Sequence, residues 1–272
     1  MYHVAMVQSR VRQSNDMNLM PFQVLIARMF RRVLHLPPAL QENCTMAEFG
    51  NFMKQETFIH SEGYALRRVI IHGRENLLHA AKETGAMAAF MHYGSFFLTG
   101  VAVRVQLELA YTAIASRRNL EIAPEPDKKF WYGVHKRSSK LYSRTLFYTD
   151  ESPRLPLSWL KQKGNVLGIV LDVREHGQKY REDAYDFLGR KIYLQSGPAR
   201  LACIAGVPIV PVTICYCQKE RRHHLFFDTP VLPDRDPVTM TQRLLDVLGA
   251  RVMPVPEQQF YDIASVLSQP AA

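Results

Sequence analysis

The stretch AMAAFMHYGSFFLTGVAVRVQLELA, residues 86–110, predicts a strand, a turn and a helix in succession. Residues 86–91 are apolar throughout, which is typical of a strand that is covered on both faces. His92 opens the turn after this strand, and Gly94 and Ser95 follow in the same turn. Residues 95–110 have the length and apolar content of a helix. A buried strand followed by a helix is the repeating unit of α/β domains.

Strands and helices continue to alternate along the rest of the chain. Further strands are predicted at residues 67–71, 112–116, 165–171, 185–188, 208–215 and 224–227, and helices at 74–84, 127–141, 155–163, 197–204 and 238–249. We therefore predict one α/β domain over residues 41–272, with a single mixed, largely parallel sheet flanked by helices. We find no internal repeat and no low-complexity linker that would divide it.

The first 40 residues form a separate N-terminal region, in which residues 20–36 predict an amphipathic helix with one apolar and one basic face. Such a helix can lie on a membrane surface, or it can pack its apolar face on the core. No signal peptide is predicted, because a continuous apolar segment is missing near the N-terminus. The longest uncharged stretch, residues 86–103, contains polar residues and does not predict a membrane span.

The chain is basic, with a formal charge of +9 and a pI near 9.4. A basic protein favours anionic partners, which include nucleic acid, anionic lipid and phosphorylated carriers. The cations are scattered and no recognition motif accompanies them, so nucleic acid is not the expected partner.

Several other classes of site find no support in the sequence. The four cysteines, at positions 44, 203, 215 and 217, form no CxxC pair, and we expect buried, reduced thiols. Neither His223-His224 nor the acidic residues have the spacing of a metal site, so no metal is expected. Phosphate-binding and dinucleotide-binding glycine loops are also missing.

Three polar features follow predicted strands: His92, the run Arg117-Arg118-Asn119, and Asp172. Ligand sites of open α/β sheets lie at the carboxyl ends of the strands. A neutral histidine there can accept a proton from a hydroxyl group, arginines can bind phosphate, and a carboxylate can orient either of them. The alternatives are a structural histidine and two surface cations.

Five segments in order resemble the bacterial lipid A biosynthesis acyltransferases, within the larger lysophospholipid acyltransferase superfamily. These segments are VIIHGRENLLHAAKETGAMAAFMHYGSFF (69–97), ASRRN (115–119), GIVLDVREHGQ (168–178), DFLGRKIYLQSGPARLACIAGVPIVPV (186–212) and VPEQQF (255–260). The resemblance implies transfer of a fatty acyl group from a thioester on acyl carrier protein or coenzyme A, without another cofactor, to a hydroxyl of a lipid or glycolipid.

The resemblance also implies roles for individual residues. His92 matches the general base of the family, and Gly94 and Ser95 lie beside it in the motif. Gly94 is expected to leave room for the reacting carbonyl. Arg117, Arg118 and Asn119 match a substrate-binding block, and Phe187, Gly189 and Arg190 match the block that binds the acceptor.

The sequence departs from the family at position 97, where the acid of the His-x4-Asp/Glu motif is replaced by Phe97. Three interpretations follow. Asp172 substitutes for the missing acid, His92 works alone on the activated thioester, or the fold is retained as a lipid- or carrier-binding partner without catalysis.

The second departure is at the N-terminus, where family members usually carry a membrane-spanning helix. Here the basic helix of residues 20–36 takes that position. We therefore expect peripheral contact with the cytoplasmic face of a bacterial inner membrane.

Overall fold

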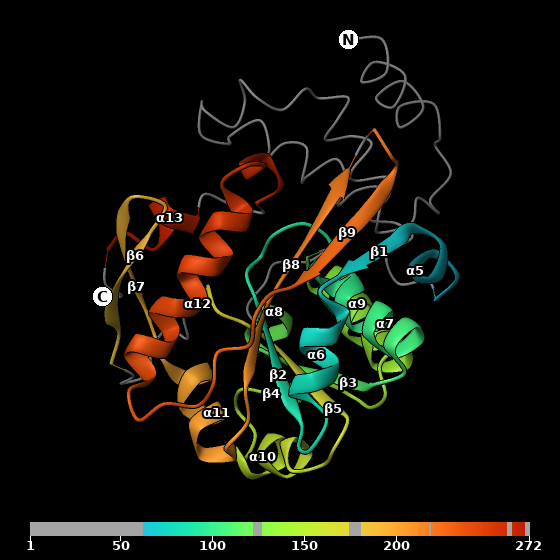
Figure 1. Cartoon of the computed structure of the whole chain (residues 1–272), viewed down its shortest axis with the longest axis horizontal. Coiled ribbons are helices and arrows are strands. Elements are labelled where there is room, and N and C mark those ends of the chain that lie inside the picture. The colour runs from blue at the N-terminus through green and yellow to red at the C-terminus, as the bar shows by residue number, and fades with distance from the viewer. Residues whose placement is uncertain (1–61, 122–126, 174–180, 218, 260–262, 270–272) are drawn as a thin grey trace.

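The computed structural model describes residues 62–121, 127–173, 181–217, 219–259 and 263–269. Within them, one seven-stranded sheet has the order β1-β9-β8-β2-β5-β3-β4, and β6 and β7 form a separate hairpin (Figure 1). The strands are β1 (Val69–His72), β2 (Ala86–Phe90), β3 (Ala110–Ala115), β4 (Phe147–Tyr148), β5 (Asn165–Val170), β6 (Asp183–Phe187), β7 (Arg190–Leu194), β8 (Ile209–Cys217) and β9 (Arg222–Phe227). The predicted α/β fold with a mixed, largely parallel sheet is confirmed.

The helices connect the strands and cover the sheet. They are α5 (Glu62–Arg68), α6 (Arg74–Ala80), α7 (Phe96–Leu107), α8 (Arg118–Glu121), α9 (Asp127–Leu141), α10 (Arg154–Leu160), α11 (Gly197–Ala205), α12 (Pro237–Val252), the 3-10 helix η1 (Pro256–Gln258) and α13 (Ile263–Val266). None of the helices in the described ranges is long and apolar enough to span a bilayer. The predicted helix of residues 20–36 lies outside those ranges.

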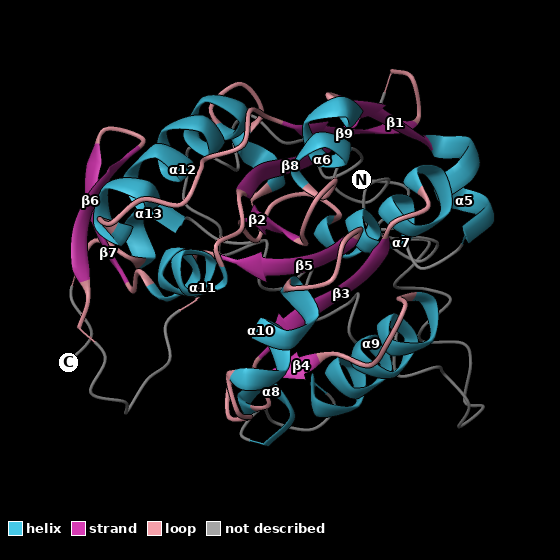
Figure 2. Ribbon diagram, turned by 60° about the horizontal axis from the view of Figure 1, so that its bottom comes forward, coloured by secondary structure: helices cyan, strands magenta, loops and turns pink. Residues whose placement is uncertain are grey.

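Side chains of β2 alternate between two apolar layers. Ala86, Ala88 and Phe90 pack in a cluster with residues of α5, α6 and α7, whereas Met87 and Ala89 pack in a second cluster with residues of α10, α11 and α12. Figure 2 shows the strands between these groups of helices. Because β2 is buried on both faces, its sequence is apolar at every position and does not alternate.

The register between β2 and β5 fixes the geometry of the candidate site. The two strands are parallel, and Phe90 is the partner of Val170. The pairing continues beyond the strand ends, because the Leu171 backbone N–H donates to the Phe90 carbonyl at 2.8 Å. Residues two positions further along each chain, His92 and Asp172, therefore leave the sheet side by side.

Several details differ from the sequence predictions: β4, α8 and α13 were not predicted, and the strand predicted at 67–71 begins at Val69, after α5. The helix predicted at 74–84 ends at Ala80, and Gly85 approaches α10 so closely that an added Cβ would lie 2.6 Å from the Leu160 carbonyl oxygen. Strand β7 was not predicted; it follows a tight turn in which Leu188 and Gly189 both have positive φ. Such turns usually have the sequence Asn-Gly, so Leu188-Gly189 did not indicate a hairpin.

Candidate active site

His92 and Asp172 make direct contact at the carboxyl ends of β2 and β5. The Nδ1 atom of His92 lies 2.9 Å from Oδ1 of Asp172. The backbone N–H of His92 also donates to the same carboxylate, at 3.0 Å to Oδ2 and 3.2 Å to Oδ1. Because an ionised carboxylate only accepts hydrogen bonds, this contact favours the tautomer with a proton on Nδ1, in which Nε2 is the nitrogen that can accept a proton.

Burial differs between the two partners. The Asp172 side chain is fully buried, whereas 19% of the His92 side chain is exposed. A buried carboxylate needs hydrogen bonds to offset its lost hydration, and His92 supplies them from its ring and its backbone. The ring of His92 also meets the ring of Phe96 edge-on, with centroids 5.1 Å apart. The imidazole is thus positioned by contacts with a carboxylate and with an aromatic ring.

The turn after His92 requires glycine at position 94. Gly94 has a φ of 52°, and an added Cβ would lie 1.9 Å from the carbonyl oxygen of Ile214 in β8. Its backbone N–H donates to the Gln258 carbonyl at 2.9 Å. The close approach of β8 therefore requires glycine at this position, and the expected room for the reacting carbonyl stays a prediction.

Residues of the C-terminal VPEQQF segment hold the same turn. The Gln258 side chain accepts from the Tyr216 backbone N–H and donates to the Tyr216 carbonyl, each at 2.8 Å. The Tyr93 hydroxyl donates to the Val255 carbonyl at 2.9 Å. The sequence predicts no role for this segment, since nothing local indicates that it contacts residues 93 and 94.

Ser95 lies at the start of α7 and points into the core. Its side chain is fully buried, and its hydroxyl lies 2.8 Å from Nε2 of His223 in β9. The other ring nitrogen of His223 lies 3.2 Å from the Tyr64 hydroxyl. Burial lowers the pKa of His223 to about 3, so this ring is neutral at physiological pH. Ser95 therefore connects the turn after His92 to the core, and its contact with a substrate stays a prediction.

Phe97, which stands where the resemblance leads us to expect an acid, lies in the first turn of α7. Its ring packs at a tilt against that of Phe96, with centroids 4.0 Å apart, and Phe97 packs on the first apolar cluster, to which Phe96 belongs. Its carbonyl accepts a hydrogen bond from the Tyr142 hydroxyl. Position 97 is thus part of the packing, and the carboxylate beside His92 is that of Asp172, two residues after the end of β5.

The arginine block follows β3, the neighbour of β5. The guanidinium of Arg117 lies 3.3 Å from Asp150 and 2.5 Å from Glu151, and it stacks on the ring of Tyr148. Its charge is therefore already compensated within the protein. Arg118 and Asn119 belong to α8, but the placement of their side chains lies outside what the structure describes.

The predicted acceptor block lies on the β6–β7 hairpin rather than on the seven-stranded sheet. Phe187 is buried in the second apolar cluster and faces Gly249 of α12. Gly189 occupies the hairpin turn, with a φ of 75°, and Arg190 begins β7 as an exposed residue. The structure does not bring these three residues into direct contact with His92 among the interactions it describes.

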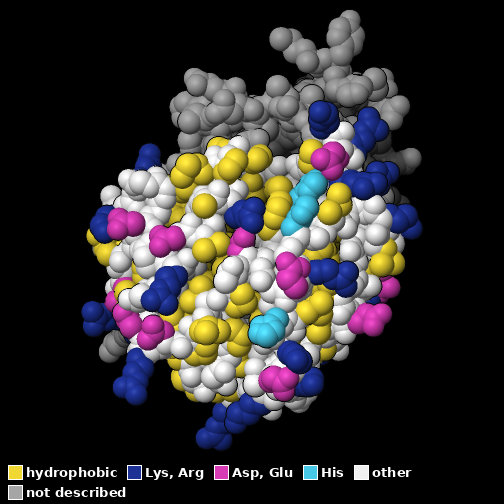
Figure 3. Space-filling view, in the orientation of Figure 1, with side chains coloured by type: hydrophobic (Ala, Val, Ile, Leu, Met, Phe, Trp, Pro, Cys, Tyr) yellow, Lys and Arg dark blue, Asp and Glu magenta, His cyan; other side chains and the backbone are white. Residues whose placement is uncertain are grey.

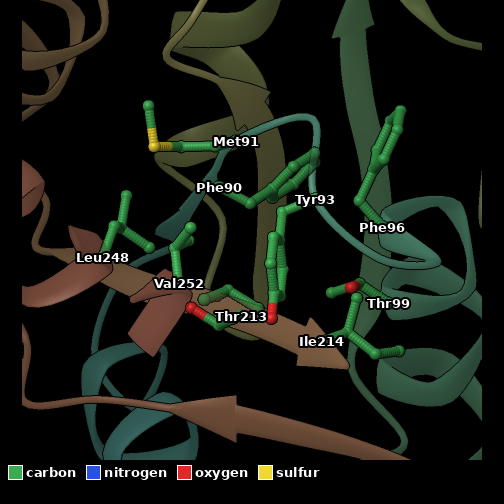
Figure 4. A pocket seen from close by; sticks show the side chains of 10 residues that line it. Phe90, Met91, Tyr93, Phe96, Thr99, Thr213, Ile214, Leu248 and Val252 are labelled. Atoms are coloured by element: carbon green, nitrogen blue, oxygen red, sulfur yellow. The ribbon is translucent and has the colours of Figure 1, made fainter. Parts of the chain in front are cut away.

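A cavity of about 10 Å³ lies beneath the His92 turn, which is close to the smallest space that holds one water molecule. Its lining includes Tyr93 and Phe96 from the turn and Leu248 from α12 (Figure 4). The buried hydroxyls of Thr99 and Thr213 also line it, and neither has a hydrogen-bond partner among the described residues.

Comparison with known families gives one match, to the bacterial lipid A biosynthesis acyltransferases, over residues 44–261. The matched region contains every described element of the seven-stranded sheet, together with His92 and Asp172. Comparison with curated proteins gives no match.

Proposed function

The chain belongs to the bacterial lipid A biosynthesis acyltransferase family, and on this premise we propose that His92 and Asp172 form its catalytic base. Family membership supports acyltransferase activity in general. The observation that carries the finer proposal is the 2.9 Å contact between His92 Nδ1 and the buried Asp172 carboxylate. It favours the interpretation in which Asp172 takes the place of the acid that position 97 lacks.

In the proposed reaction, the donor is a fatty acyl thioester of acyl carrier protein or coenzyme A. The acceptor is a hydroxyl group of a lipid or glycolipid. Nε2 of His92 takes the hydroxyl proton while the oxygen attacks the thioester carbonyl carbon. The carbon–sulfur bond then breaks, and the thiolate leaves with the proton that His92 carried. Asp172 orients the ring and stabilises the transient imidazolium.

The direct test is acyl transfer by the purified full-length protein with labelled acyl-carrier and acyl-coenzyme A donors and a bacterial membrane lipid extract. We expect labelled lipid from the wild type and a loss of at least about 10²-fold in His92→Ala, since the general base is removed. His135→Ala is the matched control, because that histidine contacts Tyr148 of β4 rather than Asp172. Equal rates for wild type and His92→Ala would exclude the proposed base.

The competing function is that of a lipid- or carrier-binding protein without catalysis. Phe97 is the residue that favours it, because the family's acid is missing there. A wild type that binds acyl carrier protein but yields no labelled lipid with any donor would support this alternative over the enzyme.

Membrane contact is a further part of the proposal. The basic face of the helix predicted at residues 20–36, with Arg28, Arg31 and Arg32, would attach the protein to the cytoplasmic face of the inner membrane. Each well-placed cation contributes about 1 kcal/mol at an anionic surface. We expect co-sedimentation with vesicles containing phosphatidylglycerol but not with phosphatidylcholine vesicles, and loss of binding when the three arginines become glutamine. Unchanged binding in that variant would contradict this mode of attachment.

A further inference from the structure

A cluster of metal-ligand side chains lies where β8 turns into β9, outside the candidate active site. Cys217 ends β8, Glu220 lies in the turn, and His224 belongs to β9. One ligand atom from each of these residues lies within 4.8 Å of those of the other two. Figure 3 shows histidine side chains in a row over β9, with an acidic side chain at the end nearer the turn.

Hairpin geometry explains why the three residues meet. In the antiparallel pair, Cys217 is opposite Arg222 and Cys215 is opposite His224. Cys217 and His224 are therefore diagonal neighbours on one face of the sheet, within reach of long side chains. The spacing along the chain resembles no common metal motif, which is why the sequence predicted no site here.

A fourth residue holds His224 in place from the neighbouring strand. Nε2 of His72, at the end of β1, lies 3.0 Å from Nδ1 of His224, and the two rings stack. The other nitrogen of His224, Nε2, lies 3.1 Å from Glu220. His72 thus makes the second-sphere hydrogen bond that metal-binding histidines usually have, leaving Nε2 to face the other ligands.

We propose that Cys217, Glu220 and His224 bind a zinc ion, with His72 as the residue that orients His224. A thiolate, an imidazole and a carboxylate are the ligands that zinc prefers. The thiolate and the carboxylate together neutralise the charge of the ion. Three protein ligands leave one tetrahedral position for water.

The surroundings are compatible with a bound cation. Glu220 is exposed and Cys217 is half-buried, so the ion has a path to the ligands. The nearby Arg251 stacks on Phe226 and pairs with Asp228, whose carboxylate compensates its charge. Zinc–ligand bonds of about 2.0–2.3 Å in a tetrahedral site place the ligand atoms about 3.3–3.7 Å from one another. The three ligand atoms must therefore move closer together to bind zinc. Rotation of the exposed Glu220 side chain and of the Cys217 side chain can provide this.

The proposed site and the turn after His92 lie on opposite faces of β9. Successive residues of a strand face opposite sides of a sheet. While His224 faces the ligand cluster, His223 faces the core and contacts Ser95 beside His92. A bound zinc ion would therefore stabilise β9 from the face opposite the candidate active site. This role is structural and does not depend on the proposed reaction.

The test uses full-length, untagged protein stripped with a chelator and titrated with Co²⁺, then with Zn²⁺. We expect one equivalent of Co²⁺ to give a thiolate charge-transfer band and tetrahedral visible bands, both removed by Zn²⁺. Cys217→Ser should lose the charge-transfer band. Cys203→Ser is the matched control, because Cys203 lies on α11 beside Asp234 and Met240 and should leave the spectrum unchanged.

Two further variants keep the test independent of folding defects. Glu220→Gln changes an exposed turn residue and should keep the thiolate band while weakening Zn²⁺ affinity, as measured by competition with a chromogenic chelator. His72→Phe should weaken Zn²⁺ affinity by about 10–100-fold, the usual effect of losing the hydrogen-bond partner of a metal-binding histidine. A wild type without the band, a band that survives in Cys217→Ser, or equal affinities for wild type and Glu220→Gln would each overturn the proposal.

Discussion

His92 opens the turn that leads into α7 and His223 contacts the same turn through Ser95, but their surroundings give them different chemistry. His92 is partly exposed and contacts a carboxylate. His223 is fully buried between the hydroxyls of Ser95 and Tyr64, and burial lowers its pKa to about 3. A carboxylate partner stabilises a protonated ring, whereas buried hydroxyls do not repay the lost hydration of a charge. The first environment suits proton transfer and the second keeps a neutral ring as a packing element.

The largest expected effect comes from making the partner of His92 neutral. Asp172→Asn keeps the shape of the side chain, but its amide can donate to Nδ1 and so favour the tautomer with its proton on Nε2. We expect kcat for acyl transfer to fall by about 10²–10⁴-fold. Single-turnover acyl transfer by this variant measures the change.

The control for that prediction is Asp150→Asn, which alters a carboxylate paired with Arg117 at an exposed position. It should leave kcat within about threefold, since exposed ion pairs contribute little. If Asp172→Asn retained the wild-type rate, His92 would act without the carboxylate, and the comparison of the two histidines would lose its basis.

A second prediction concerns His223 and the dependence of stability on pH. The unfolded chain protonates this histidine below pH 6.5, whereas the folded protein resists protonation down to about pH 3. Between these values the unfolded state binds more protons, so stability falls as the pH falls. His223 contributes a slope of about 1.4 kcal/mol per pH unit. Urea unfolding from pH 4 to pH 7 measures it.

Replacing His223 with leucine should flatten this slope, although the variant will also lose its contacts with Ser95 and Tyr64. The exposed His79→Gln is the control and should keep the wild-type slope. An unchanged slope in His223→Leu would show that other groups cause the acid sensitivity.

A third prediction separates stability from catalysis at the C-terminal segment. Gln258→Ala removes the two hydrogen bonds with Tyr216 and loosens the contact that holds Gly94. We expect the free energy of unfolding to fall by about 1–3 kcal/mol. We also expect kcat to fall more than KM changes, because His92 is less well positioned.

Gln242→Ala provides a matched control for Gln258→Ala. The Gln242 side chain makes the same pair of hydrogen bonds, here with the backbone of Asp186 in β6, at 2.9 Å each. It should cost stability without a change in kcat. If both variants lost activity equally, the role of Gln258 would be structural alone.

The sequence predicted the fold and the polar residues at the strand ends. It did not predict which of these residues contact one another. His92 and Asp172 follow two apolar strands, so their place at the sheet edge could be predicted. Their contact depends on the pairing of Phe90 with Val170, which a single sequence does not contain. The hydrogen bonds from the turn after His92 to Gln258 and His223 could not be predicted, because they join residues more than 100 positions apart in the chain.

The smallest expected effect is that of placing an acid at position 97, where the resemblance leads us to expect one. If Phe97 had disabled the site, Phe97→Glu would raise activity from near zero. In the proposed arrangement the carboxylate position beside His92 is already filled by Asp172. A glutamate would instead replace a ring that packs on Phe96 and the first apolar cluster. We therefore expect no gain in kcat and a loss of stability of about 1–3 kcal/mol, measured by acyl transfer and urea unfolding.

Combining Phe97→Glu with Asp172→Asn sharpens the comparison. Activity rescued in this double variant would show that either position can supply the carboxylate, whereas no rescue would tie catalysis to the geometry of β5.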